Sequence, residues 1–231
     1  MDSRNLTLSV LIPCYNEETN LQKNLPKIQE QLQPEKILVV DDGSTDKTRN
    51  VAEQKGCDIT PKRENKGKGC SVRQGLKELD TDLVLLTDAD LSAPLKEYQK
   101  LRSNIEDADI AIGSRGLPGS EEETTLSKKI GGKAGNFLIR NLLGLPYKDT
   151  QCGFKLFKQK AIQNIFPKMT LNGFGYDFEL LLIAKRQGIQ TAEVPIEWNI
   201  DHDSHVKPSD YMKTLLELYT VKWNDLNNVY G

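Results

Sequence analysis

Residues 82–91 have the sequence DLVLLTDADL, in which an apolar run leads directly into two closely spaced aspartates. The run Asp82–Thr87 is short and apolar and has no helical period, so we interpret it as a buried β-strand. Asp88 and Asp90 follow this strand, one residue apart. The stretch therefore predicts a core strand that ends in a pair of carboxylates.

Apolar stretches of the same kind alternate with helical patterns through the first half of the chain. The predicted strands are 6–13, 36–40, 58–61, 82–87 and 109–113. Between them apolar residues recur at helical spacing, as in Leu21, Leu25, Ile28 and Leu32. Strands separated by helices form βαβ units, which build a mostly parallel sheet covered on both faces. We therefore predict an α/β fold.

In sheets of this kind, ligands bind where the carboxyl ends of the strands emerge. Three predicted strands end in polar stretches, namely Tyr15–Glu17, Asp41–Gly43 and Asp88–Asp90. Polar groups therefore collect at one edge of the predicted sheet, and we expect the functional site there.

After Arg115 the character of the chain changes. Residues 116–125 (GLPGSEEETT) have almost nothing to bury, which predicts a mobile loop that could act as a lid. Helices are predicted over 126–143, over 176–186 and from Pro208 onward, and strands over 155–157 and 192–198. No repeat or convincing boundary divides the chain, so we predict a single domain over residues 1–231.

The composition is that of an ordinary globular protein, with 37% hydrophobic and 28% charged residues among 231. A formal net charge of −2 gives no global attraction to nucleic acid, so we expect no nucleic-acid partner. No run approaches the roughly 18 apolar residues of a membrane span, and the N-terminus does not resemble a secretion signal. The four cysteines form no C-x-x-C pair, which argues against structural zinc and favours a reduced, cytoplasmic chain.

Asp88 and Asp90 are the sharpest chemical signal. Mg²⁺ or Mn²⁺ is normally held by one or two such carboxylates together with substrate phosphates. A cation held there would oppose the negative charge that grows on a departing diphosphate. The structural alternative is a helix-capping turn before Pro94.

The other strand ends carry weaker signals, each with a plain structural alternative. An acid in Asp41–Asp46 (DDGSTD) can accept hydrogen bonds from a base or a ribose, but Gly43 and Ser44 equally suit a turn and a helix cap. Residues 13–17 (PCYNE) offer an aromatic ring to a base, or form only a turn. Residues 65–69 (NKGKG) can present N–H groups and lysines to phosphates, or form a solvated loop.

Together these stretches resemble glycosyltransferase family 2. PCYNE, DDGSTD, NKGKG, DADL and GSR occur in the order and at the intervals of the family, and the match covers most of the chain. The resemblance implies the Rossmann-like GT-A fold, with 1–115 as the nucleotide-sugar-binding half and 116–231 as the acceptor half. Residues 149–157 (DTQCGFKLF), 176–180 (YDFEL) and 204–207 are most similar to the polyprenyl-phosphate glycosyltransferases, above all those that make dolichyl-phosphate glucose.

The resemblance also implies roles for individual residues. The nucleotide would be contacted by Pro13, Tyr15, Glu17, Asp41 and Asp42. Ribose, diphosphate and metal would be served by Lys68, Asp88, Ala89 and Asp90, with Asp90 the more direct metal ligand. The sugar pocket would be lined by Asp177 or Glu179, with further substrate contacts from Gln151 and Lys207. The acceptor's phosphate would be met by Arg115 and Lys129.

The chain departs from the family pattern in two places. Mannose-type relatives often carry Gln two residues after the D-x-D, where this chain has Ser92, which we assign to the metal site. Lys128 and Lys129 stand where the family has paired arginines, so the bidentate fork for phosphate is lost. His202 or His205 could complete the metal site, or lie in a solvated loop.

The expected acceptor is a lipid phosphate. A sugar hydroxyl needs a general base, whereas a phosphate monoester is largely ionised at neutral pH and needs only cations to dock it. Basic residues follow Arg115 in the next predicted helix, and the Q-x-x-R-W motif of polymer-extending members is absent. The hypothesis is therefore an inverting transfer of a hexose, with UDP-glucose as the expected donor, to a polyprenyl or dolichyl phosphate.

Three alternatives remain. The acceptor could be a glycan or protein hydroxyl, with Asp177 as the base, or the chain could bind a nucleotide sugar without transferring it. The C-terminal helix could lie in a lipid headgroup layer, giving peripheral contact at the cytoplasmic face of a membrane, or pack on the core or a second subunit. Its candidate contact residues are Lys213, Leu215, Leu216, Leu218, Tyr219, Lys222 and Trp223.

Overall fold

The computed structural model describes residues 6–61, 64–122, 126–199 and 208–231. Its centre is a seven-stranded sheet with the strand order β3-β2-β1-β4-β7-β5-β8. The strands are β1 (Leu8–Cys14), β2 (Lys36–Asp41), β3 (Asp58–Pro61), β4 (Leu83–Leu86), β5 (Ile110–Ser114), β7 (Lys155–Lys158) and β8 (Thr191–Pro195). Neighbouring strands are parallel except at β7, which runs antiparallel to both β4 and β5.

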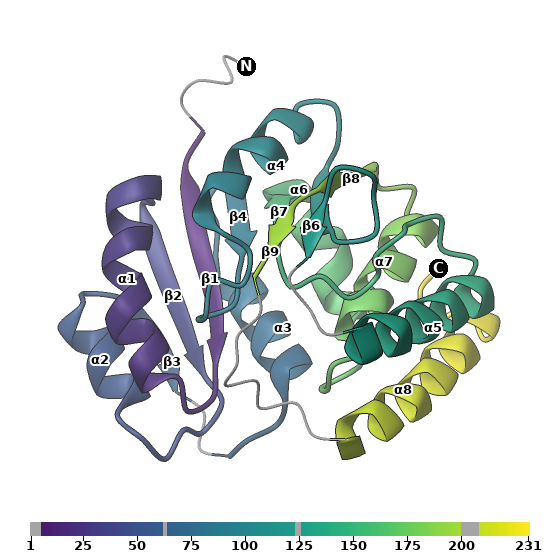
Figure 1. Cartoon of the computed structure of the whole chain (residues 1–231), viewed down its shortest axis with the longest axis horizontal. Coiled ribbons are helices and arrows are strands. Elements are labelled where there is room, and N and C mark those ends of the chain that lie inside the picture. Colours follow the sequence, from purple (N-terminus) through teal and green to yellow (C-terminus); the bar gives the residue numbers. More distant parts are fainter. Residues whose placement is uncertain (1–5, 62–63, 123–125, 200–207) are drawn as a thin grey trace.

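Helices cover both faces of this sheet (Figure 1). One face is covered by α1 (Glu18–Leu32), α2 (Thr48–Gln54) and α4 (Tyr98–Asn104), the last preceded by a short 3-10 helix, Leu95–Glu97. The other is covered by α3 (Lys68–Glu78), α5 (Leu126–Leu143), α6 (Gln159–Ile165), α7 (Tyr176–Arg186) and α8 (Pro208–Leu226), with a 3-10 helix at Phe166–Lys168. Each face has its own hydrophobic core.

Successive residues of a strand point to opposite faces, so a strand that is covered on both sides must be apolar throughout. In β1, Val10 and Ile12 enter the core with α1, whereas Leu11 enters the core with α3. Apolar residues in these stretches show neither a helical nor an alternating pattern because both faces of each strand are buried. The predicted α/β architecture, mostly parallel and covered on both faces, is confirmed.

Residues 191–198 form two strands, where a single strand was predicted over 192–198. β8 ends at Pro195, and the chain then changes partner, because β9 (Glu197–Trp198) pairs with β6 (Glu121–Glu122). Ile196 lies between the two sheets, and its N–H donates to the carbonyl of Ser114 at 3.2 Å. The stretch predicted as a mobile loop therefore contains a strand, while its residues 123–125 lie outside the described part of the chain.

The helices predicted over 126–143 and 176–186 are confirmed as α5 and α7. Helix α2 begins at Thr48, whose backbone N–H donates a hydrogen bond to Asp46 Oδ1 at 3.0 Å. Among the described residues, no helix has the length and apolarity needed to cross a bilayer.

Candidate active site

β1 and β2 end side by side, and the turns that follow them are hydrogen-bonded into one unit (Figure 1). Cys14 pairs with Asp41 in the ladder, and the Asp42 N–H donates to the Cys14 carbonyl at 2.8 Å. Ser44 donates its N–H to Asp41 Oδ1 at 2.9 Å, and its Oγ accepts from the Asn16 N–H at 2.9 Å. Asp41 therefore shapes the turn at this strand end.

The other predicted nucleotide contacts lie at the same tip. Pro13 is buried in β1, whereas 42% of the Tyr15 surface is exposed. Glu17 is half-buried, and its carboxylate accepts a hydrogen bond from Asn20 Nδ2 at 2.7 Å. Tyr15 thus offers an aromatic surface on which a base can stack at the strand end.

Asp42 is buried and holds the backbone of the NKGKG stretch. Its Oδ1 accepts from the Lys66 N–H at 3.0 Å, and its Oδ2 from the Gly67 N–H at 2.6 Å. Gly67 has φ +97°, and a Cβ there would lie 2.4 Å from the carbonyl oxygen of Asn172, so only glycine fits. These carboxylate contacts position the loop that begins α3.

Lys68, the first residue of α3, reaches from that loop to the end of β4. Its Nζ lies 2.5 Å from Asp88 Oδ1. Burial alone would lower the pKa of Lys68, but the charges of Asp88, Asp177 and Asp90 outweigh it and raise this pKa. The ends of β2 and β4 are therefore joined through residues 66–68, so the predicted convergence of the acidic strand tips is present.

Asp88 is packed against the backbone of Gly153. A Cβ on Gly153 would lie 2.7 Å from Asp88 Oδ2 and 3.3 Å from Oδ1, so a side chain here would push the carboxylate away. The next residue, Ala89, is buried, and its carbonyl accepts from Asn24 Nδ2 at 2.9 Å. Gly153 and Asn24 hold this strand end in place from two sides.

Asp90 is held by Ser92. The Ser92 N–H donates to Oδ1 at 2.8 Å and the Ser92 hydroxyl donates to Oδ2 at 2.9 Å. Ser92 itself is buried. Its hydroxyl therefore orients the carboxylate of Asp90, and its assignment to the metal site stays a prediction. Burial, and then the like charge of Asp88, raise the pKa of Asp90.

The charges of these strand ends converge on Cys14. Burial raises the pKa of its thiol well above the usual value, and the negative charges of Glu17, Asp41 and Asp88 raise it further. Three carboxylates from three different strand ends thus act on one sulfur atom. The site is a concentration of negative charge that Lys68 partly offsets.

The residues present fit a hard divalent cation. In the part of the chain that the structure describes, no three His, Cys, Asp or Glu side chains form a metal cluster. The carboxylates of Asp88 and Asp90 would therefore share the ion with phosphate oxygens, as is usual for Mg²⁺. A dication bound there would relieve the repulsion from Asp88 that, after burial, raises the pKa of Asp90.

Asp177 forms a buried ion pair with Lys155. Lys155 Nζ donates to Asp177 Oδ1 and to the Cys152 carbonyl, and only 1% of Lys155 is exposed. Burial raises the pKa of Asp177, while Lys155 and then Lys68 oppose this rise. The charges of Lys68 and Asp88 also act on this paired carboxylate. These contacts favour a positioning role over the alternative role of general base.

Glu179 is fully buried on the other side of α7. Its carboxylate accepts hydrogen bonds from the N–H groups of Thr170 and Leu171 and from the hydroxyls of Thr170 and Tyr230. These donors come from the segment before α7 and from the C-terminus. Its oxygens therefore hold two segments of the core together, and its part in the sugar pocket stays a prediction.

Arg115 is engaged by Asp149. Its Nε donates to Oδ2 at 2.6 Å and its Nη2 to Oδ1 at 3.0 Å, and the guanidinium lies 4.9 Å from the ring centre of Trp198. Burial would raise the pKa of Asp149, but the charge and hydrogen bonds of Arg115 lower it below its usual value. Gln151 is half-buried beside them and donates its N–H to Asp149 Oδ1 at 3.1 Å. The bidentate face of Arg115 thus holds a carboxylate, where an acceptor phosphate was predicted.

Five predicted residues cannot be placed by their side chains. Lys128 and Lys129 lie at the start of α5, where the structure describes the backbone only. Lys207, His202 and His205 lie outside the described residues. Their roles stay predictions.

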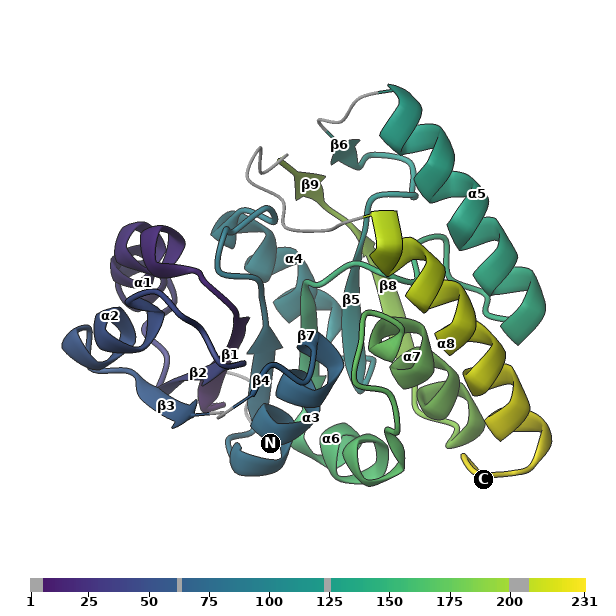
Figure 2. The same cartoon turned by 90° about the horizontal axis from the view of Figure 1, so that it is seen from below.

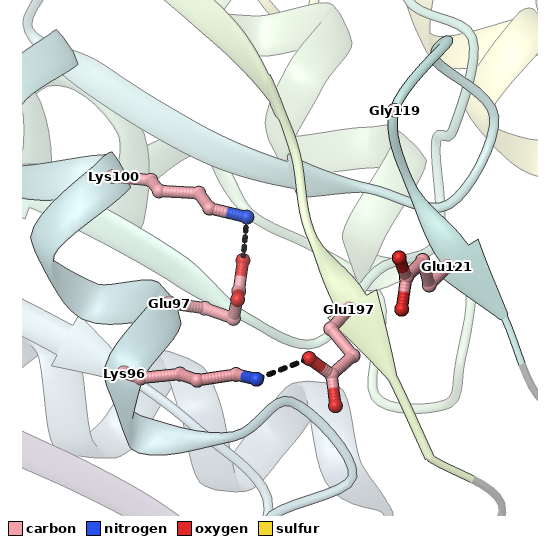
Figure 3. Close-up of a pocket in the computed structure, with 6 residues that line it drawn as sticks. All are labelled: Lys96, Glu97, Lys100, Gly119, Glu121 and Glu197. Carbon is pink, nitrogen blue, oxygen red and sulfur yellow. Dashed lines mark ion pairs between the residues drawn. The ribbon is translucent and has the colours of Figure 1, made fainter.

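A separate charged hollow lies between the start of α4 and the β6–β9 pair (Figure 3). It is lined by Lys96, Glu97, Lys100, Gly119, Glu121 and Glu197. Lys96 pairs with Glu197, and Lys100 pairs with Glu97 at 2.7 Å. Because its lysines are paired within the lining, we assign it no part in the chemistry at Asp88 and Asp90.

The sequence analysis missed three supporting residues, which are Asn24, Gly153 and Lys155. Lys155 had a detectable signal, because a lysine that opens an apolar strand is an unusual core residue. Gly153 lies inside the quoted stretch DTQCGFKLF, but its proximity to Asp88 depends on two distant segments meeting.

Solved structures of one enzyme share this fold. Glucosyl-3-phosphoglycerate synthase from Mycobacterium tuberculosis, in complex with UDP, matches with a TM-score of 0.71 at 20% identity, over 94% of this chain and 80% of that one. Its complex with Mn²⁺, UDP-glucose and phosphoglyceric acid gives 0.72 at 18% identity, with the same coverage. These matches show that the chain has the GT-A fold.

The family model described as glycosyl transferase family 2 matches residues 9–166, so the chain belongs to this family. Dolichyl-phosphate beta-glucosyltransferase ALG5C of Trichomonas vaginalis is 32% identical over 91% of this chain and 69% of the relative. The dolichyl-phosphate beta-glucosyltransferase of Saccharomyces cerevisiae is 32% identical over 99% and 78%, and that of Homo sapiens 30% over 90% and 72%. The predicted resemblance is confirmed.

Proposed function

We propose that this chain transfers glucose from UDP-glucose to a polyprenyl phosphate of the dolichyl type, with Mg²⁺ or Mn²⁺ held at Asp88 and Asp90. The observation that carries the proposal is the convergence of Asp42, Lys68, Asp88 and Asp90 at one sheet edge. The chain that carries this site is similar to dolichyl-phosphate beta-glucosyltransferases over nine-tenths or more of its length.

The donor's diphosphate would lie against Asp88 and Asp90. A metal ion bound there supplies positive charge that opposes the charge developing on departing UDP. Lys68 supplies a further positive charge beside Asp88, and the exposed ring of Tyr15 offers a surface for the base. Asp42 keeps the loop that carries Lys68 in register with the strand ends.

The reaction would be a single displacement with inversion. An oxygen of the acceptor phosphate forms a bond to the anomeric carbon of glucose, while the bond from that carbon to UDP breaks and UDP leaves with the electron pair. No base is required, because the phosphate monoester is already ionised. The engagement of Asp177 by Lys155 supports this acceptor over a hydroxyl, which would need that carboxylate as a base.

The experiment that tests the proposal is the transfer of labelled glucose from UDP-glucose to dolichyl or undecaprenyl phosphate in detergent, with GDP-mannose and UDP-N-acetylglucosamine as competing donors. We expect a lipid-linked product that requires Mn²⁺ or Mg²⁺. Asp90→Ala should lower kcat by about a hundredfold or more, because transition-state charge is left without its counter-ion. Asp107→Ala removes an exposed aspartate between α4 and β5 and should keep full activity.

Full activity of Asp90→Ala would contradict the metal assignment. Transfer to a sugar or protein hydroxyl but not to a lipid phosphate would contradict the acceptor class, and would return Asp177 to the role of base. UDP binding without transfer to any acceptor would favour a silent nucleotide-sugar-binding protein.

We also propose that the outer faces of α5 and α8 dock on a lipid surface. In α8 the exposed apolar residues recur at helical spacing and form a stripe roughly 100° wide. They are Met212, Leu215, Leu216, Tyr219, Trp223 and Leu226. The opposite face of α8, with Leu218 and Val221, is buried in the core. The stripe is therefore additional to the residues that fix the helix in the fold.

Helix α5 lies beside α8 (Figure 2). It exposes a second stripe, formed by Phe137, Leu138 and Leu142. We call the two stripes together the α5–α8 apolar face. A bilayer surface is the occupant that fits it, because aromatic and aliphatic side chains stand beside basic ones. Helix α5 contains four basic residues and no acidic one, and Lys213 is exposed on α8. The proposed acceptor is itself a membrane lipid, so docking on a bilayer would also bring the chain to its acceptor.

The four cysteines are free, and Cys14, Cys57 and Cys152 are buried. This supports a reducing compartment, and we propose the cytoplasmic face of the membrane as the location.

A further inference from the structure

Lys68 stands where the proposed metal ion would need to bind. Its ammonium lies 2.5 Å from Asp88 Oδ1, and Asp90 adds to the field that acts on it. The side chain is 24% exposed, so it is open to solvent on one side. In this structure the lysine is thus the cation that balances the paired aspartates.

Asp88 has little room to accept a second cation without rearrangement. The backbone of Gly153 packs against one side of the carboxylate, where an added Cβ would lie 2.7 Å from Oδ2. Lys68 occupies Oδ1 on the other. A dication that enters beside Asp90 would meet the ammonium at short range, and like charges repel strongly in a partly buried site.

We propose that Lys68 exchanges partners when the donor binds: it neutralises Asp88 in the empty site and moves to the diphosphate when the metal ion takes Asp88. The inference rests on the proposed function, because it assumes a metal ion at Asp88 and Asp90. A lysine suits the exchange, since its ammonium is a compact charge on a flexible stem of four carbons. The diphosphate gives the displaced ammonium a new anionic partner, and such charge-assisted contacts are strong.

The exchange predicts that Lys68 has opposite effects on the affinities for the metal ion and for the nucleotide. It competes with the metal ion for Asp88 in the absence of nucleotide, so its removal strengthens metal binding. It contacts the diphosphate in the loaded site, so its removal weakens nucleotide binding. If Lys68 only supported the fold, its removal would weaken both metal binding and nucleotide binding.

The test is a pair of titrations on the full chain, with Mn²⁺ followed by electron paramagnetic resonance and UDP by calorimetry. For Lys68→Met, we expect Mn²⁺ without nucleotide to bind about fivefold more tightly, since a partly exposed ion pair is worth about 1 kcal/mol. UDP in saturating Mn²⁺ should bind about tenfold more weakly, which corresponds to the loss of one charge-assisted contact. Lys68→Arg keeps the competing charge and should leave the Mn²⁺ affinity near that of the wild type.

Lys77→Met is the matched control, because it removes the same charge from the exposed last turn of the same helix. Both affinities should be unchanged in this variant. Equal or weaker Mn²⁺ binding by a folded Lys68→Met protein would overturn the exchange while leaving the proposed function intact. Wild-type protein that binds UDP but no Mn²⁺ would overturn the metal assignment, and the exchange with it. If Lys68→Met does not fold, a Lys68→Gln protein is measured in its place.

Discussion

Gly153 leaves room for the carboxylate of Asp88, because a Cβ at this position would lie 2.7 Å from Oδ2. Gly153 does not have a positive φ, so alanine suits its backbone and the steric effect alone is tested. At the residue scale we expect Gly153→Ala to displace Asp88 and lower kcat/KM for UDP-glucose by about a hundredfold. Circular dichroism should show an unchanged fold. Gly132→Ala, whose added Cβ meets nothing within 4 Å, should keep full activity, and equal activity of the two variants would contradict this role for Gly153.

The ion pair between Arg115 and Asp149 joins the end of β5 to the segment before β7, and Trp198 of β9 packs on the guanidinium. At the element scale this pair should make stability depend on pH. Because the pKa of Asp149 is lower in the folded chain, the contribution is complete above about pH 4, the unfolded value, and is lost as pH falls through the folded value. We expect Asp149→Asn to lower the free energy of unfolding by about 2 kcal/mol at pH 7. Urea unfolding should show this difference shrinking below pH 4, and a constant difference would contradict it.

The α5–α8 apolar face lies on two neighbouring helices (Figure 2). It consists of nine large exposed hydrophobic residues. At the scale of the whole molecule we expect the chain to co-sediment with vesicles that contain anionic lipid, and less with neutral vesicles or at high salt. Leu216→Ser with Trp223→Ser should lower the partition coefficient about tenfold or more, since each buried side chain contributes about 1.5–3 kcal/mol. Val229→Ser, beyond the end of α8, is the control. A concentration-dependent dimer that the double variant abolishes, without vesicle binding, would assign this face to a second copy.

Much of the fold and part of the site could be predicted from sequence. Stretches such as Asp82–Thr87 predicted buried strands, and the aspartates that follow them do meet at one sheet edge. The roles of individual residues within the site were harder to predict. Ser92, Asp177 and Glu179 carry polar groups that suit ligand binding, but their actual partners are Asp90, Lys155 and the 170–171 backbone. Such pairings depend on segments that the sequence does not place together.

The sequence by itself determined the alternation of strands and helices, the spacing of Asp88 and Asp90, and the family to which these belong. These features are local, because residues close together in the sequence are enough to show burial on both faces of a strand or the spacing of a helix. The tertiary structure alone decided that β7 is antiparallel, that Lys68 reaches Asp88, and that the backbone of Gly153 packs against one side of that carboxylate. These depend on packing between distant segments, where a few ångströms decide whether a polar group meets a ligand or another side chain.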